Sequence, residues 1–207
     1  MTSATSQIAG VVLAGGRARR MGGRNKAFIE VAGRRMIDHV LARLCPQVVA
    51  TAISVNDDLA QWQEFGLPLL PDSFPDRPGP LAGILAGLDW AAAEGFTAIV
   101  TVATDTPFFP RDLVSHLCAA RGTNGVTLAA SPDRAGRLQQ HPVFGLWPVR
   151  LRENLRDSLK AGTRRAGQWA RLHDAGQTDF SGPEDPFFNI NTPDDLRRAG
   201  EVAARLA

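Results

Sequence analysis

The chain has 207 residues, which is enough for one domain with a hydrophobic core and short for two. Hydrophobic residues make up 44% of it and charged residues 21%, with a formal net charge of +2, so a disordered chain is excluded. Neither a membrane-spanning run of about 18 apolar residues nor a signal-peptide pattern is present, so we expect a cytoplasmic protein.

Apolar runs typical of strands alternate with helical patterns along the chain. We expect strands at 8–13, 47–55, 68–72, 96–105, 125–131 and 141–148, and helices at 36–44, 59–65, 81–93, 151–159 and 167–172. A last helix is expected to begin at Pro193, with Thr192 as its N-cap. This order favours an α/β fold of three layers with a mainly parallel central sheet, formed as a single domain over 1–207. The isolated Cys45 and Cys118 indicate buried thiols rather than a disulfide, a metal site or a nucleophile.

The most basic stretch follows the first predicted strand. It holds five cations and no acid, and these are Arg17, Arg19, Arg20, Arg24 and Lys26. Two glycine pairs accompany them, and glycine lets backbone N–H groups approach phosphate oxygens whose charge Arg and Lys neutralise. Without these cations the acidic residues outnumber the basic ones, so the positive charge is local and indicates a site for a small anion. A solvated basic loop is the alternative interpretation.

The spacing within this stretch excludes two familiar phosphate-binding motifs. A P-loop needs Gly-Lys-Ser/Thr, whereas Lys26 follows Asn25 and precedes Ala27. The dinucleotide pattern G-x-G-x-x-G is also absent from the stretch. A nucleic-acid site is disfavoured because the basic loop lacks interleaved aromatic residues.

The stretch LAGGRARRMGGRNK resembles a nucleotidyltransferase signature, L-A-G-G-x-x-x-R-M-G followed by a lysine. Four further motifs follow in order, which are PGPLAG after Asp72, DTPF at Asp105, HPVFGLW at His141, and FFNINTPDDL near the end. Together they resemble the molybdenum cofactor guanylyltransferases, which join the GMP part of GTP to the terminal phosphate of molybdopterin and release pyrophosphate. The resemblance covers nearly the whole chain. It implies a Rossmann-like nucleotidyltransferase fold in which about 1–110 bind the nucleotide and about 111–207 bind the acceptor.

The resemblance also implies roles for single residues. Lys26, Arg20 and Asp105 are the expected catalytic residues, with Lys26 at the α-phosphate of GTP. Asp105 is expected to hold Mg²⁺, the one cofactor implied, with Asn191 as a second ligand. Nucleotide binding is expected from Leu13, Ala14, Gly15, Gly16, Gly22, Lys26, Ser54, Asn56, Asp72 and Asp105. Ser54 stands where the family often has an asparagine, and Asn56 is the alternative for that contact.

The acceptor is expected to meet His141, Pro142, Asn189 and Asn191. The implied partners are GTP and molybdopterin, with molybdenum-insertion proteins and apo-molybdoenzymes as possible protein partners and neither nucleic acid nor membrane. Two alternatives stay open at this point. One is a related nucleotidyltransferase that uses CTP or another acceptor, and the other is a non-catalytic carrier of nucleotide or cofactor.

Overall fold

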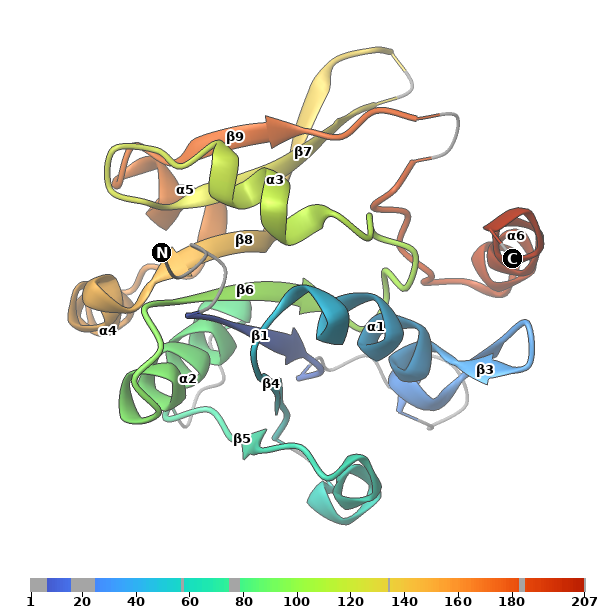
Figure 1. The fold of residues 1–207 in the computed structure, drawn as a ribbon, viewed down its shortest axis with the longest axis horizontal. Coiled ribbons are helices and arrows are strands. Elements are labelled where there is room, and N and C mark those ends of the chain that lie inside the picture. Colours follow the sequence, from blue (N-terminus) through green and yellow to red (C-terminus); the bar gives the residue numbers. More distant parts are fainter. Residues whose placement is uncertain are drawn as a thin grey trace.

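A computed structural model describes residues 7–15, 25–56, 58–74, 79–133, 135–182 and 185–206. Within these ranges one sheet has the strand order β5-β4-β1-β6-β8-β7-β9 (Figure 1). Its strands are β1 (Ile8–Leu13), β4 (Thr51–Ser54), β5 (Leu69–Leu70), β6 (Ala98–Ala103), β7 (Thr127–Pro132), β8 (Leu138–Pro148) and β9 (Gly176–Asp179). Strands from both halves of the sequence therefore share one sheet.

The sheet is mainly parallel. Strand β1 pairs in parallel with β4 and β6, β4 pairs in parallel with β5, and β7 with β9. Only β8 runs the other way, between β6 and β7, in the part of the chain that the structure describes. The carboxyl ends of β1, β4, β5 and β6 consequently meet at one edge of the sheet, where α/β folds bind their ligands.

Helices cover both faces of the sheet because the apolar strands present side chains to both sides. Ile8 and Val12 of β1 join a core with α1 (Met36–Leu44), α3 (Leu113–Ala119) and the 3₁₀ segment η3 (Leu59–Phe65). Ala9 and Val11 join a second core with α2 (Pro80–Ala93), α4 (Arg152–Lys160) and α5 (Ala166–Arg171). This alternation along one central strand produces the three layers.

The C-terminal helix packs beside the first third of the chain. Helix α6 (Pro193–Leu206) buries Ala199 and Val202 against Val31 of β2 (Glu30–Val31) and Met36 at the start of α1. Strand β2 forms a short antiparallel hairpin with β3 (Arg34–Arg35). Figure 1 shows α6 beside this hairpin and α1, away from the sheet. The last helix therefore brings its amino end close to the segment that follows the basic stretch.

The structure confirms the α/β class and most of the predicted elements, but some helices and strands begin or end at other residues than predicted. The strand expected over 47–55 was too long, because Cys45–Gln47 form a 3₁₀ turn, η2, and the strand occupies only Thr51–Ser54. Cys45 is exposed, so the prediction of a buried thiol there is wrong. The hairpin β2–β3, helix α3 and strand β9 were not predicted. They are short, and β9 (Gly176–Asp179) is polar and only half-buried.

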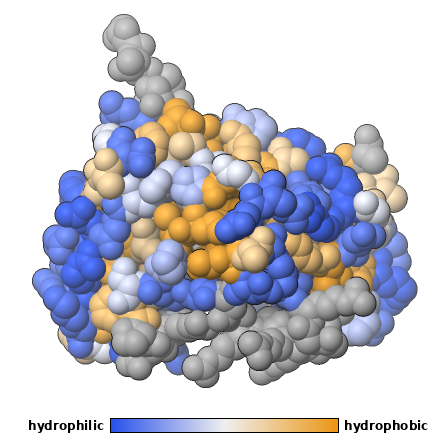
Figure 2. Space-filling model, turned by 90° about the horizontal axis from the view of Figure 1, so that it is seen from below, coloured by the Kyte–Doolittle hydropathy of each residue, from blue (hydrophilic) through white to orange (hydrophobic). Residues whose placement is uncertain are grey.

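Strand β5 ends the sheet on the side seen in Figure 2. Its two leucines point to different faces, since Leu69 packs on the first core and Leu70 on the second. On this side of the molecule hydrophobic residues gather near the middle and hydrophilic ones surround them. Among the residues that the structure describes, none of the helices has the length and apolar character needed to cross a membrane.

Candidate active site

Lys26 is the centre of a polar cluster beyond the carboxyl end of β6. It begins the 3₁₀ turn η1 (Lys26–Phe28), where the side chain of Asn25 accepts a hydrogen bond from the N–H of Ala27. The Lys26 Nζ atom donates to Oδ2 of Asp105 at 3.1 Å and to Oδ1 of Asn191 at 2.7 Å. Only 9% of Lys26 is exposed, so its ammonium is held by protein oxygens rather than by bulk water. The structure thus brings together three of the residues that the sequence singled out.

The loop after β6 and the segment before α6 are joined at this cluster. The N–H of Ile190 donates to the backbone oxygen of Asp105 at 2.8 Å. The hydroxyl of Thr106, which is fully buried, donates to Oδ1 of Asn189 at 2.5 Å. Asn189 and Asn191 therefore both lie beside the Asp105 loop. Thr106 was missed by the sequence analysis, although it directly follows Asp105 in the DTPF motif.

The side chain of Asn191 contacts Lys26, and its backbone contacts the first turn of α6. Thr192 caps the helix as predicted, because its Oγ1 accepts the N–H of Asp195 at 3.1 Å. Oδ2 of Asp195 accepts the N–H groups of Thr192 and Asn191, each at 2.9 Å. These hydrogen bonds, with the charge of Lys26 as a smaller contribution, lower the pKa of the Asp195 carboxyl. Asp195 is a second residue missed, and the T-x-x-D spacing of a capping box could have indicated it.

A second pair of predicted residues meets at the ends of β4 and β5. The side-chain amide of Asn56 donates to Oδ2 of Asp72 at 2.9 Å, and its Oδ1 accepts the N–H of Asp72 at 2.7 Å. Gly15, after β1, lies against the same amide, because a Cβ on it would be 3.0 Å from Nδ2 of Asn56. Leu13 and Ala14 precede it, and the N–H of Ala14 donates to the backbone oxygen of Ser54 at 2.9 Å. Gly15, Asn56 and Asp72 thus form one group at this edge.

The side chain of Ser54 does not reach this group. It is 2% exposed, and a Cβ on Gly83 of α2 would lie 2.7 Å from its Oγ. Ser54 therefore packs beneath the strand ends while Asn56, two residues on, carries the amide beside Asp72.

His141 and Pro142 lie at an irregularity in β8. The register of β7 and β8 shifts at this point, because Ala129 of β7 pairs with His141 while the preceding Leu128 pairs with Gly145. Strand β8 therefore has more residues than β7 between these two pairs. The His141 ring stacks on Phe187 with centroids 4.4 Å apart, and its Nε2 lies 2.8 Å from Oγ of Ser131. Burial lowers the pKa of His141, against an opposing influence from Asp185.

Pro142 faces a different neighbour. A Cβ on Gly167 of α5 would lie 3.1 Å from the Pro142 Cγ, so the ring packs closely on that helix. His141 instead contacts Phe187, in the segment that leads to Asn189. Of these two predicted acceptor residues, His141 is therefore the one whose side chain is linked to the 189–191 segment.

Three predicted residues, Gly16, Arg20 and Gly22, lie outside the described residues. The described loop ends, Gly15 and Asn25, lie next to the two polar groups above. Among the described residues, no group of three or more His, Cys, Asp or Glu side chains is arranged to hold a metal ion. Asp105 and Asn191 each supply an oxygen to the same cation, the Lys26 ammonium, and both are hard ligands of the type that Mg²⁺ takes.

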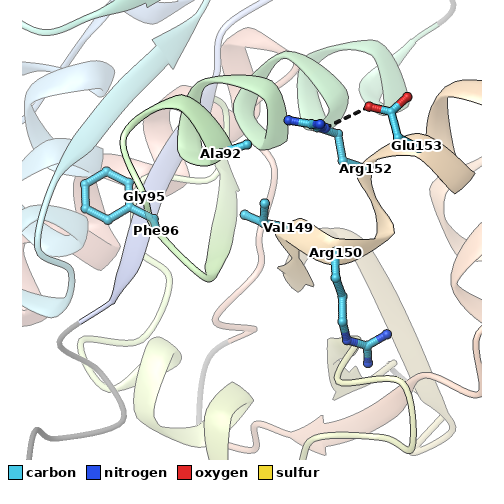
Figure 3. A pocket seen from close by; sticks show the side chains of 7 residues that line it. All are labelled: Ala92, Gly95, Phe96, Val149, Arg150, Arg152 and Glu153. Carbon is cyan, nitrogen blue, oxygen red and sulfur yellow. Dashed lines mark hydrogen bonds and ion pairs between the residues drawn. The ribbon is translucent and has the colours of Figure 1, made fainter.

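Two cavities lie at the opposite edge of the sheet. One, of about 530 Å³, is lined by residues that include Thr97, Ala98, Pro148 and Arg150. Ala98 begins β6 and pairs with Pro148, so this cavity is at the amino end of β6. The other, of about 310 Å³, adjoins it, and Figure 3 shows Arg152 in its lining paired with the neighbouring Glu153. Neither of these two cavities is lined by a residue of the polar clusters described above.

Comparison with known proteins identifies the family of the chain. Residues 10–176 match the family model of the MobA-like NTP transferase domain. The chain is 46% identical over 210 residues to a molybdenum cofactor guanylyltransferase of Bradyrhizobium sp. (strain ORS 278), covering 98% of this chain and 96% of that protein. A molybdenum cofactor guanylyltransferase of Cereibacter sphaeroides is 45% identical over 201 residues, covering 97% and 100%.

Solved structures share the fold at lower identity. Molybdopterin-guanine dinucleotide biosynthesis protein A from Archaeoglobus fulgidus superimposes with a TM-score of 0.72 at 24% identity, covering 95% of this chain and 99% of that one. The 4-diphosphocytidyl-2C-methyl-D-erythritol synthase of Anaerococcus prevotii also has a TM-score of 0.72, at 14% identity and with 97% of each chain covered. The fold is thus that of nucleotidyltransferases, and the sequence relatives narrow the assignment. The chain belongs to the molybdenum cofactor guanylyltransferases, nucleotidyltransferase enzymes built on the MobA-like NTP transferase domain.

Proposed function

We propose that the protein transfers GMP from GTP to the terminal phosphate of molybdopterin. An oxygen of that phosphate forms a bond to the α-phosphorus of GTP, and the bond from the α-phosphorus to the β-phosphate oxygen breaks. Pyrophosphate leaves with the electron pair of the broken bond. The attacking phosphate is already an anion, so the reaction needs no side-chain nucleophile and depends on positioning and charge.

One observation carries this proposal: the buried ammonium of Lys26, held between Asp105 and Asn191 directly after the basic stretch. A cation held in place at low solvent exposure can stabilise charge that develops in the transition state without having to reorganise. We assign Lys26 to the α-phosphate for this reason. Arg20, Gly16 and Gly22 are proposed to surround the outer phosphates, as the glycine-rich sequence indicates.

Asp105 and Asn191 fit a magnesium site. Mg²⁺ usually takes one or two protein carboxylates and completes its coordination with water and phosphate oxygens. The Asp105 side chain is 33% exposed, so one carboxylate is accessible from the edge where the nucleotide is proposed to lie. When bound, Mg²⁺ supplies charge neutralisation between the two phosphate groups. Lys26 would add a second positive charge beside the metal, and the Asp105 and Asn191 oxygens would hold the metal in place.

The guanosine part of GTP is assigned to the group formed by Gly15, Asn56 and Asp72. The mutual hydrogen bonds of Asn56 and Asp72 fix two polar side chains in one arrangement. Gly15 has no side chain between them and the end of β1, so a nucleotide can approach the backbone there. Leu13 and Ala14, which directly precede Gly15, are proposed to lie under the base and ribose.

Molybdopterin is assigned to the side of the cluster formed by the later part of the chain. Asn189 and Asn191 would meet its terminal phosphate, because they lie at the Asp105 loop. His141 would border the same substrate through its contact with Phe187. This division gives about 1–110 to the nucleotide and about 111–207 to the acceptor. Molybdenum-insertion proteins and apo-molybdoenzymes are proposed recipients or suppliers of the cofactor.

The test is a transfer assay with the purified protein, Mg²⁺ and molybdopterin, in which GTP, CTP, ATP and UTP are supplied in turn. We expect pyrophosphate release with GTP and a guanine dinucleotide product. A reaction without molybdopterin and one with the Asp105→Asn variant are the controls. Preference for CTP would assign the chain to a cytidylyl transfer. GTP binding with no pyrophosphate released would instead indicate a carrier.

A further inference from the structure

The junction between Asn191 and α6 has one hydrogen bond more than a helix cap requires. In a capping box the side chain of the third helical residue accepts the N–H of the N-cap residue. Asp195 does this for Thr192 at 2.9 Å, and the hydroxyl of Thr192 accepts the N–H of Asp195 at 3.1 Å. The same carboxylate oxygen also accepts the N–H of Asn191 at 2.9 Å. This extra bond acts on the residue that contacts Lys26.

Asn191 needs such support because packing does not hold it. Its side chain is exposed, whereas the preceding Ile190 is fully buried and bonded through its N–H to the Asp105 backbone. Beyond Asn191 the chain turns into α6, where Asp195 is the group that fixes its backbone. Rotation of this peptide would move Oδ1 of Asn191 away from the Lys26 ammonium, now 2.7 Å from it.

We propose that Asp195 is a positioning residue for the transfer reaction. Its carboxylate fixes the backbone of Asn191, so that the side-chain oxygen of Asn191 stays on Lys26. The inference rests on the proposed function for the reaction. The hydrogen bond from the N–H of Asn191 to Asp195 does not depend on which nucleotide is used. Residues that orient the groups of an active site typically contribute about 10–100-fold to activity or metal affinity.

Two neighbours provide matched controls. Asp194 is also in the first turn of α6, but it is 92% exposed and its carboxylate lies 3.7 Å from Arg197. Asp194→Ala therefore removes the same charge from the same helix end without touching Asn191. Thr192→Ala removes the hydroxyl that caps Asp195 and keeps the carboxylate on Asn191. Asp194→Ala changes the helix end alone, whereas Thr192→Ala also removes a hydroxyl that helps to lower the pKa of the Asp195 carboxyl.

The experiment compares kcat, KM for GTP, the Mg²⁺ concentration for half-maximal rate, and thermal unfolding among these variants. Asp195→Ala should lower kcat about 10–100-fold and raise the Mg²⁺ requirement, with KM for GTP changed much less. Asp195→Asn keeps an acceptor oxygen and should recover most of kcat. Asp194→Ala and Thr192→Ala should keep kcat within about threefold of the wild type. Equal losses of kcat in Asp195→Ala and in either control would overturn the inference.

A double-mutant cycle tests whether Asp195 acts through Asn191. In the Asn191→Ala background, Asp195→Ala should cost no further kcat, and additive losses would contradict the inference. If Asp195→Ala does not fold, Asp195→Glu replaces it, because glutamate suits a capping box but extends the carboxylate by one methylene. If the wild type transfers no nucleotide, the proposed function fails. The same cycle is then measured as the Mg²⁺ concentration that gives half-maximal binding of GTP, and additive increases in that concentration would contradict the positioning role.

Discussion

The Nζ atom of Lys26 lies 2.7 Å from Oδ1 of Asn191, although 165 positions separate the two residues in the sequence. Asp105, 79 positions after Lys26, supplies the second oxygen at 3.1 Å. Three distant segments thus meet at one ammonium group. The Asp105 side chain is 33% exposed and Asn191 is exposed, so replacing either of them should affect the proposed reaction more than the fold.

Replacing Lys26 should separate turnover from binding. Lys26→Ala is expected to lower kcat by about 100-fold or more, as loss of one positioned donor does elsewhere, while GTP affinity falls far less. Pyrophosphate release gives kcat, and calorimetric titration with GTP gives the affinity. Lys160→Ala is the matched control, because Lys160 lies on α4 with a side chain that is 63% exposed. Equal losses of turnover and affinity in Lys26→Ala would mean that Lys26 only binds the nucleotide.

Replacing the carboxylate of Asp105 should remove activity and leave the fold intact. Asp105→Asn keeps the size and an oxygen for Lys26 but loses the charge, and we expect a rate loss on the order of a thousandfold. The side chain is 33% exposed, so it adds little to the core. Thermal unfolding and pyrophosphate release should be followed across Mg²⁺ concentrations. Full activity at every concentration, or a much earlier unfolding transition, would make Asp105 a structural residue instead.

Two glycines should respond to alanine in opposite directions. A Cβ on Gly83 of α2 would lie 2.7 Å from Oγ of Ser54 and 2.9 Å from Cδ2 of Leu13, so Gly83→Ala should destabilise the protein by about 1–3 kcal/mol. Gly200, inside α6, has nothing within 4 Å of such a Cβ. Gly200→Ala should therefore stabilise it by about 0.5–1 kcal/mol through helix propensity. Urea unfolding of both variants measures these changes, and a Gly83→Ala protein as stable as the wild type would show that α2 can shift.

His141 should make stability depend on pH. Burial lowers its pKa in the folded protein, so the unfolded chain binds a proton more readily, beginning near pH 6.5. A lowered folded pKa leaves stability intact above that pH and reduces it as the pH falls toward the folded value. The free energy of unfolding of the wild type should thus drop more between pH 8 and pH 5 than that of His141→Gln. Urea unfolding of both proteins at the two pH values tests this, and parallel changes would exclude His141 as the cause.

The elements that could be predicted were those marked by residues close together in the sequence. The apolar run of β1 and the Thr192–Pro193 helix start are visible in neighbouring residues, and both were found. The meeting of Lys26 with Asn191 has no local signal, and only the order of family motifs placed both residues in one site. The polar strand β9, at the edge of the sheet, lacks the apolar alternation that identifies a strand.

Side-chain contacts were harder to predict than positions in the chain. Ser54 ends the buried strand β4 and Asn56 follows two residues later, and the sequence left open which of the two contacts the nucleotide. The close approach of Gly83 of α2 buries the Ser54 hydroxyl, and this packing depends on a helix about thirty residues later. Similarly, the second hydrogen bond of Asp195 depends on the turn of the backbone at Asn191, which no spacing rule specifies.

The strand order also has a consequence for protein synthesis. β1 lies in the interior of the sheet between β4 and β6 and is made before both, so the parallel strands β1, β4, β5 and β6 can pair once β6 has emerged. Lys26 is synthesised 165 residues before Asn191. A nascent chain can therefore pair these strands well before Lys26 has Asn191 as its second partner. The cluster around Lys26 is then complete only after synthesis has passed Asn191, and a product that stops before Asn191 lacks it.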